Sequence, residues 1–212
     1  MDLDLYIITD ETIAAGRTHR EIARFAIAGG ADAIQLRDKW CGTKALCSTG
    51  RQIREITRKT GTLFIVNDRL DVAIACGADG VHLGQGDLRV DVARQVAPRS
   101  FVIGVSVGNA VEAVEAEKAG ADYVALSPVF STTTKDDAGP GHGLSALREI
   151  RAEVSVPVVA IGGISRTNVR EVIGAGADGV AVISAVVGQP DITTAARDFK
   201  DLITAAKRER QR

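Results

Sequence analysis

A short pattern that occurs four times along the chain constrains the fold more than any other feature. Its copies read AGGADAIQLR (28–37), ACGADGVHLG (75–84), KAGADYVALS (118–127) and AGADGVAVIS (175–184). A glycine at this place is typical of the left-handed turn that ends a helix. The apolar run that follows Gly-Ala-Asp suits a strand buried on both faces. Each copy therefore predicts a helix end, a tight turn and a parallel strand.

Four further apolar runs lie between these copies, at 3–9, 62–67, 101–106 and 157–163. The stretches between the runs are mostly amphipathic, at 18–28, 43–59, 87–97, 109–119, 144–152, 167–175 and 192–207, and the connection at 69–76 is short. Eight units in 212 residues average about 26 residues each, which is roughly what a strand with its crossover helix needs. The even spacing favours a closed (β/α)₈ TIM barrel over an open doubly wound sheet. No linker or change of composition divides the chain, so we expect residues 1–212 to form a single catalytic domain.

The composition excludes several classes of partner. The formal net charge is −1, so no global field attracts nucleic acid or an anionic membrane, and we expect neither as a partner. No apolar run approaches the roughly 20 residues needed to cross a bilayer, and the acidic start MDLDLYIITD does not resemble a signal peptide. Three cysteines without paired spacing argue against a disulfide framework and a zinc site. We expect a cytoplasmic protein, either a monomer or a small homo-oligomer.

Polar residues follow the predicted strands, where the chemistry of such barrels is found. Arg37 and Lys39 end the second run, Asn67 and Asp68 the third, and Asp87 follows the fourth. Two interpretations stay open for the charged members of this group. They either form a salt-bridge network or, with Mg²⁺ on the two carboxylates, bind a diphosphate.

A second group follows the seventh and eighth runs, where these barrels commonly bind a phosphate. Its members are Gly162, Gly163, Ile183 and Ser184, and we expect a helix to begin at Ser184 and point its positive end at a monophosphate. The segment 127–143 is rich in Gly, Ser, Thr and Pro. It is either a surface loop or a lid over the ligands.

The motifs, taken in order, resemble those of thiamine phosphate synthases. They read QLRDK, VND, HLGQGD, GVS, SPVFSTTTK, IGGI and VIS, and the resemblance extends from YIITD to the end of the last predicted strand. It implies an enzyme that joins 4-amino-5-hydroxymethyl-2-methylpyrimidine diphosphate to a thiazole phosphate. The products would be diphosphate and thiamine monophosphate, with loss of CO₂ if the thiazole is carboxylated.

The resemblance also implies roles for individual residues. Positions matching Gln35, Arg37, Lys39 and Asn67 bind the pyrimidine diphosphate, as do those matching Ser106 and Lys135. Asp68 and Asp87 match Mg²⁺ ligands. The thiazole phosphate site matches Thr132, Thr134, Gly163, Ile183 and Ser184. We expect Arg37, Lys39, Lys135 and Ser106 to be catalytic, because charge grows on the departing diphosphate.

Three rival functions are distinguished by particular residues. A thiazole tautomerase-like paralogue should lack the paired aspartates and carry a histidine in the segment where Pro128 stands. A sugar-phosphate isomerase or epimerase would share the second group but has no use for QLRDK. A non-catalytic sensor of thiamine phosphate would retain both sites, and only turnover separates it from an enzyme.

Five further features have less specific interpretations. His82 either contacts substrate or is hydrogen-bonded inside the barrel, and Trp40 either shields the site or packs on a helix. The pattern assigns no role to His142. We expect His19 to be exposed at the start of the first helix, and the tail 207–212 to be a solvated, frayed helix end.

Overall fold

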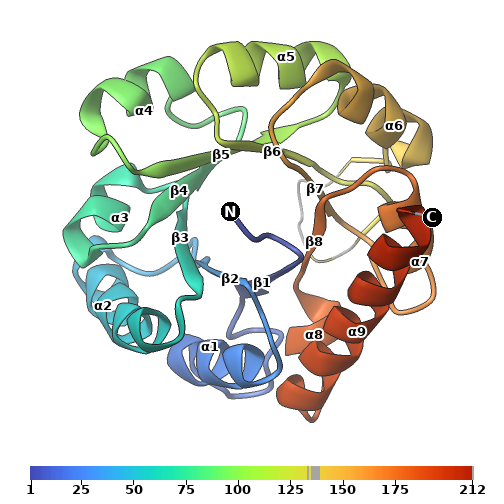
Figure 1. Ribbon diagram of the computed structural model, residues 1–212. Helices are drawn as coiled ribbons and strands as arrows, with labels where there is room; N and C mark the ends of the chain where they lie inside the picture. Colours follow the sequence, from blue (N-terminus) through green and yellow to red (C-terminus); the bar gives the residue numbers. More distant parts are fainter. Residues whose placement is uncertain (133, 135–138, 212) are drawn as a thin grey trace.

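The computed structural model describes residues 1–132, 134 and 139–211. Eight parallel strands close into a barrel in sequence order, and the helices form a ring around it (Figure 1). The strands are β1 (Leu5–Thr9), β2 (Ala33–Leu36), β3 (Leu63–Asn67), β4 (Gly80–Leu83), β5 (Val102–Val107), β6 (Tyr123–Leu126), β7 (Val158–Ile161) and β8 (Gly179–Val182). The helices are α1 (His19–Ala28), α2 (Thr43–Thr60), α3 (Leu70–Cys76), α4 (Val90–Val96), α5 (Ala110–Lys118), α6 (Gly143–Glu153), α7 (Val169–Gly174), α8 (Ser184–Val187) and α9 (Ile192–Arg210). The predicted (β/α)₈ barrel is therefore confirmed.

The glycines of the four repeats take the left-handed conformation that the sequence predicts. The φ angles of Gly30, Gly77, Gly120 and Gly176 are 95°, 70°, 99° and 112°. Glycine adopts these angles without the steric penalty that a Cβ atom brings. Each helix therefore turns directly into the strand that follows it.

The aspartates of the repeats join neighbouring strands at the end of the barrel where the strands begin. Asp79 Oδ2 accepts the backbone N–H of Phe64 at 2.9 Å, and the same carboxylate pairs with Arg54 from α2. Equivalent contacts join Asp32 to Leu5 and Lys200, Asp122 to Ile103 and Arg94, and Asp178 to Val158 and Arg151. These contacts explain the aspartate of the repeat as a structural residue. It lies at the end of the barrel whose residues typically contribute to stability rather than to catalysis.

The barrel interior is packed at that same end. Leu3 belongs to the interior cluster and is 3% exposed. The first residues of the chain lie across the middle of the barrel in Figure 1. A Cβ atom on Gly179 would lie 1.8 Å from the carbonyl oxygen of Leu3, so β8 needs glycine where this segment crosses. The strand starts are therefore closed by side chains, and the strand ends remain for chemistry.

One expectation, the exposure of His19, was wrong, and one about the tail was wrong in part. His19 is buried, at 4% exposure, because its ring lies under the loop that follows β2 and its Nδ1 is 2.7 Å from Thr9 Oγ1. The described part of the tail does not fray, because α9 continues to Arg210, although residues 208–211 are exposed as expected. Lys207 pairs with Asp4, and Arg210 Nη1 donates to the carbonyl oxygens of Ile173 and Ala177. Among the described residues, no helix is both long enough and apolar enough to cross a membrane.

Candidate active site

Three cavities adjoin one another at the ends of the strands. The first, here called the β2–β5 cavity, is lined by Arg37, Lys39, Asn67, Asp68, His82, Asp87, Ser106, Pro128, His142 and neighbouring residues. The second, the β7–β8 cavity, is lined by Ser127, Pro128, Thr132, Thr134, Gly163, Ile183, Ser184 and neighbours. The third extends from Asp10 to Trp40 and shares Arg37 and Lys39 with the first and Thr134 with the second. Both predicted groups therefore lie on one rim.

The β2–β5 cavity brings together the first predicted group. Arg37, Lys39, Asn67, Asp68 and Asp87 all line it, although they are up to 50 residues apart in the chain. The reason is the parallel pairing of β2 with β3 and of β3 with β4, which aligns the strand ends. Two carboxylates and two cations thus face one space.

Asp68 stands in a strained turn directly after β3. Its φ angle is 60°, a value that few residues other than glycine adopt. The N–H of Arg69 donates to the carbonyl oxygen of Asn67 at 2.7 Å, and the N–H of Asp68 donates to that of His82 at 2.8 Å. These bonds hold the backbone in place. Strain of this kind is concentrated at functional sites.

Asp87 is held by the loop that follows β4. Its Oδ2 accepts the N–H of Gly84 at 2.7 Å, and its own N–H donates to the carbonyl oxygen of Gly84 at 3.2 Å. A Cβ atom on Gly84 would lie 3.0 Å from Oδ2, so glycine permits this close approach. One carboxylate oxygen is therefore fixed by the backbone.

The donor chemistry of the β2–β5 cavity fits Mg²⁺. Magnesium is usually held by one or two carboxylates, with water and substrate phosphates completing the octahedron. Asp68 and Asp87 supply two carboxylates to one cavity. No cluster of three or more His, Cys, Asp or Glu ligands occurs in the part of the chain that the structure describes. The protein thus offers a partial site of the kind that a phosphate-bearing ligand completes.

Arg37 is oriented by a residue that the sequence analysis missed. Its Nη1 lies 3.3 Å from Asp10 Oδ2, and the Arg37 side chain is 11% exposed. Asp10 Oδ1 also accepts the N–H groups of Thr12 and Ile13, which fixes the carboxylate at the end of β1. Asp10 ends the motif YIITD. Its position directly after a predicted strand could have indicated that it belongs to the site.

The loop between β2 and α2 is fixed by contacts of Asp38 with its own backbone and with His19. Asp38 accepts the N–H groups of Trp40 and Cys41, both at 2.9 Å, and lies 3.5 Å from His19 Nε2. Burial raises the pKa of Asp38, but these N–H groups and His19 outweigh it and lower the pKa below its ordinary value. Trp40 is 91% exposed, so it packs on no helix. Lys39 is thus carried by a loop with several fixed contacts.

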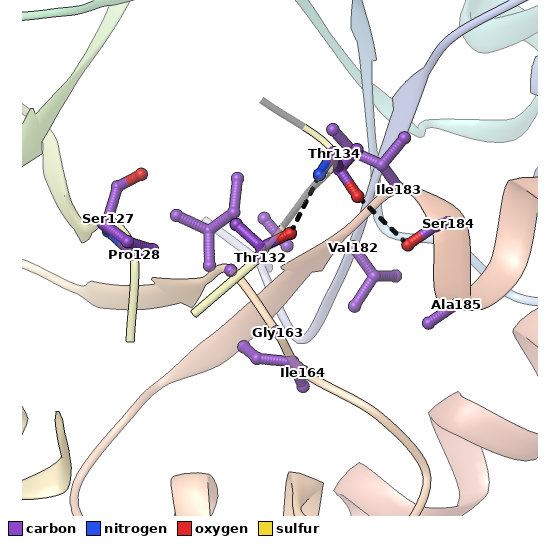
Figure 2. A pocket seen from close by; sticks show the side chains of 13 residues that line it. Ser127, Pro128, Thr132, Thr134, Gly163, Ile164, Val182, Ile183, Ser184 and Ala185 are labelled. Atoms are coloured by element: carbon purple, nitrogen blue, oxygen red, sulfur yellow. Dashed lines mark hydrogen bonds between the residues drawn. The ribbon is translucent and has the colours of Figure 1, made fainter. Parts of the chain in front are cut away.

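The β7–β8 cavity contains the described members of the second group. Figure 2 shows the hydrogen bonds that join Thr132, Thr134 and Ser184. Thr134 N donates to Thr132 Oγ1 at 3.2 Å, and the hydroxyls of Thr134 and Ser184 are 3.3 Å apart. The short helix α8 begins at Ser184, as the sequence predicts. Lys135 lies outside the described residues.

Gly162 and Gly163 both have positive φ angles, which favour glycine. Their φ angles are 98° and 63°. A Cβ atom on Gly163 would lie 2.7 Å from Phe130 Cβ and 2.8 Å from the carbonyl oxygen of Ser131. Asn168 Nδ2 donates to the carbonyl oxygen of Gly163 at 3.0 Å and so fixes the loop. The pair lets the β7 loop pack closely against the segment that follows β6.

Gln35 and His82 belong to a hydrogen-bonded network inside the barrel. Gln35 is 2% exposed, and its Nε2 donates to the hydroxyl of Tyr6 at 2.8 Å. His82 contacts the hydroxyls of Tyr123 and Ser106, both at 2.9 Å. The interpretation of His82 as a hydrogen-bonded barrel histidine is therefore confirmed, and its ring also lines the β2–β5 cavity. Tyr6 and Tyr123 could not be recognised from the sequence, because both resemble ordinary apolar strand residues.

Comparison with known proteins gives a consistent result. A family model described as thiamine monophosphate synthase matches residues 5–186. A thiamine-phosphate synthase from Methanoregula boonei is 74% identical over 99% of this chain and 97% of that protein. One from Methanoculleus marisnigri is 65% identical over 99% of both chains. The structure of a thiamine phosphate pyrophosphorylase from Pyrococcus furiosus superposes with a TM-score of 0.90, at 44% identity and 97% coverage of each chain.

A more distant structure shows the fold alone. A 3-hexulose-6-phosphate synthase has a TM-score of 0.70 at 18% identity and covers 94% of this chain and 99% of that chain. This likeness is limited to the barrel and says nothing about the residues of the two cavities.

Proposed function

The chain belongs to the thiamine monophosphate synthase family, and from this we propose that it condenses 4-amino-5-hydroxymethyl-2-methylpyrimidine diphosphate with a thiazole phosphate. The products are thiamine monophosphate and diphosphate. The observation that carries the proposal is the adjacency of the two cavities, which share Ser127 and Pro128. One cavity has the charges for a metal-bound diphosphate, and the other has the small and hydroxyl residues for a monophosphate.

The residues of the β2–β5 cavity would bind the pyrimidine diphosphate. Arg37 offers a planar fork of N–H donors and Lys39 a point charge to the phosphate oxygens. Asp68 and Asp87 would hold Mg²⁺. When bound, the ion supplies positive charge to the leaving diphosphate. Asn67 and Ser106 add neutral hydrogen-bonding groups.

The residues of the β7–β8 cavity would bind the thiazole phosphate. Thr132, Thr134 and Ser184 bring hydroxyl groups to one space, and Gly163 and Ile183 complete its wall. With both substrates on one rim, the thiazole nitrogen is held near the methylene carbon of the pyrimidine. This removes much of the entropy cost of their encounter.

The reaction then follows from charge. The C–O bond to diphosphate breaks, and the pyrimidine amino group stabilises the resulting methylene cation by resonance. Arg37, Lys39 and, outside the described residues, Lys135 stabilise the charge that grows on the leaving group. The thiazole nitrogen attacks the methylene carbon, and no protein nucleophile is needed. If the thiazole is the carboxylated form, CO₂ leaves afterwards.

The test is diphosphate release by purified protein with each substrate alone and with both. We expect release only with both substrates and Mg²⁺, and loss of release in EDTA. Thiamine monophosphate and CO₂ are measured in the same mixtures, which identifies the thiazole form. Release unchanged in EDTA would contradict the metal assignment, and absence of turnover with intact binding of thiamine monophosphate would favour a sensor.

Asp68→Asn and Asp87→Asn test the two carboxylates individually. We expect each to lower kcat at least about 100-fold, since a lost charge contact of several kcal/mol is at stake. Asp91→Asn is the matched control, because Asp91 lies outside the β2–β5 cavity and pairs with Arg89 at 2.9 Å. Loss of activity in the control as well would point to a general effect of charge.

A further inference from the structure

A continuous chain of hydrogen bonds crosses the barrel from Gln35 to Ser106. Gln35 Nε2 donates to the hydroxyl of Tyr6 at 2.8 Å, and the hydroxyls of Tyr6 and Tyr123 are 3.1 Å apart. The Tyr123 hydroxyl is 2.9 Å from His82 Nδ1, and His82 Nε2 is 2.9 Å from Ser106 Oγ. The chain begins in the closed interior and ends at a residue that lines the β2–β5 cavity.

The two tyrosines are fixed in position and in protonation state. Tyr6 is 1% exposed and Tyr123 is fully buried. Their rings meet edge to face with centroids 6.1 Å apart, and His82 stacks on Tyr123 at 5.6 Å. Burial raises the pKa of both phenols well above the ordinary value, so each keeps its proton. Each phenol therefore has one O–H group that needs a hydrogen-bond acceptor.

The number of hydrogen-bond donors fixes the direction of the hydrogen bonds from Gln35 to Ser106. Within the described residues, the Tyr6 hydroxyl has two hydrogen-bond partners, Gln35 and Tyr123. Since Gln35 Nε2 donates to Tyr6, the Tyr6 proton is available for Tyr123, and the Tyr123 proton is then available for His82 Nδ1. His82 must carry its own proton on Nε2 and donate it to Ser106.

The opposite direction is disfavoured by the cost of a buried, unpaired donor. If His82 Nδ1 donated to Tyr123, the Tyr123 proton would point to Tyr6, and the Tyr6 oxygen would accept twice. The Tyr6 proton would then have no acceptor among the described residues, although Tyr6 is 1% exposed. A buried donor left unpaired has lost its hydrogen bonds to water and gained none in return, which is unfavourable.

We propose that Tyr6, Tyr123 and His82 are positioning residues that act through Ser106. With the Gln35 amide at its start, the hydrogen-bond chain places a proton on His82 Nε2 and makes Nδ1 the acceptor of the Tyr123 hydroxyl. Ser106 Oγ accepts that N–H, so its own proton is free to be donated into the β2–β5 cavity. The chain thus makes Ser106 a donor toward an anionic oxygen and adds no charge of its own.

The value of this arrangement to the reaction rests on the proposed function. A hydroxyl donor that is already oriented stabilises an oxygen on which negative charge is growing, because no reorganisation is needed during the step. A serine whose proton pointed back at His82 would present only lone pairs to the same oxygen. The direction of the chain therefore decides whether Ser106 assists or opposes departure of the diphosphate.

The first test measures the tautomer in the substrate-free protein. Protein labelled with ¹⁵N-histidine is studied by NMR above the ordinary histidine pKa of about 6.5. The variants His19→Gln and His142→Gln assign the other two rings. We expect the His82 signals to show a protonated Nε2 and an unprotonated Nδ1. A protonated Nδ1, the pattern that a reversed Gln35 amide would impose, overturns the proposal.

The second test asks whether Tyr123 acts through Ser106. We expect Tyr123→Phe to shift the His82 signals toward a mixture of tautomers and to lower kcat about tenfold, the worth of one hydrogen bond in the transition state. In a Ser106→Ala background the same change should have no further effect on kcat. Effects that multiply in the double variant would overturn the proposal.

Tyr6→Phe is the second variant, for the case in which Tyr123→Phe does not fold. It removes the donor to Tyr123 but leaves the contact between Tyr123 and His82. We expect a smaller loss of kcat that is likewise absent in the Ser106→Ala background. The NMR result does not depend on turnover. If the protein made no thiamine phosphate but showed a protonated His82 Nε2, the proposed function would be refuted. The direction of the hydrogen bonds from Gln35 to Ser106 would still be established.

Discussion

The backbone N–H of Arg69 donates to the carbonyl oxygen of Asn67 at 2.7 Å and closes a three-residue turn around Asp68. The φ angle of Asp68 is 60° in this turn. Aspartate and asparagine tolerate positive φ better than other residues with a Cβ atom. The backbone turn therefore needs a residue that tolerates positive φ, but it does not need the negative charge of the Asp68 side chain.

Substitution of Asp68 should show this separation directly. We expect Asp68→Asn to keep the melting temperature of the native protein while it removes most turnover. Asp68→Ala should lose the same turnover and also about 1 kcal/mol of unfolding free energy, because alanine tolerates the turn less well. Thermal denaturation and the diphosphate assay measure the two effects. Equal stability of the two variants would show that the turn is not strained.

Ser184 tests the β7–β8 cavity. We expect Ser184→Ala to raise the KM for the thiazole phosphate about tenfold, since one hydrogen bond to a charged group is worth about 1.5 kcal/mol or more. The KM for the pyrimidine diphosphate should change little. Steady-state kinetics with each substrate varied in turn measures both constants. An increase only in the KM for the pyrimidine diphosphate would show that the two substrates have been assigned to the wrong cavities.

Gly104 makes room for Tyr123. A Cβ atom at position 104 would lie 1.9 Å from Tyr123 Cζ, so Gly104→Ala must displace the ring. We expect a loss of about 1–3 kcal/mol in unfolding free energy from overpacking. Chemical denaturation measures this loss. Gly174→Ala is the control, because nothing lies within 4 Å of the added atom, and its stability should be unchanged or higher.

The repeat aspartates should matter for stability and not for catalysis. Asp79→Ala removes the acceptor of the Phe64 N–H and the partner of Arg54. We expect a loss of about 2 kcal/mol in unfolding free energy and unchanged kcat for the folded fraction, because Asp79 lies at the far end of the barrel. Asp201→Ala, at an exposed position on α9, is the control. Lower kcat in folded Asp79→Ala would contradict the structural role.

Asp4 should stabilise the folded protein at neutral pH, and this contribution should disappear in acid. Burial raises its pKa, but hydrogen bonds and charges from Lys207 and Lys200 outweigh burial, and the net pKa is lowered. A lowered pKa in the folded state stabilises the protein above the unfolded pKa of about 3.9, and this is lost as pH falls through the folded value. We expect Asp4→Asn to be less stable than the native protein at neutral pH and to approach it in strong acid. Denaturation curves at both pH values measure this, and a constant difference would contradict it.

The barrel and the place of its chemistry could be predicted from the sequence alone. Four Gly-Ala-Asp repeats and even spacing imply eight strand–helix units, and parallel strands place their ends together. This is why residues as distant as Arg37 and Asp87 could be assigned to one cavity before any coordinates. Periodicity and turn chemistry are local properties, so a single sequence contains them.

The residues that support this chemistry became identifiable only in the folded protein. Asp10 contacts Arg37 across two strand ends, His19 is buried beneath a loop, and Lys207 reaches Asp4 over most of the chain length. Tyr6 and Tyr123 look like ordinary strand residues, and only barrel closure brings their hydroxyls to 3.1 Å. Such contacts depend on distance and direction between side chains far apart in sequence. No local pattern records these quantities, because they arise only when the chain has folded.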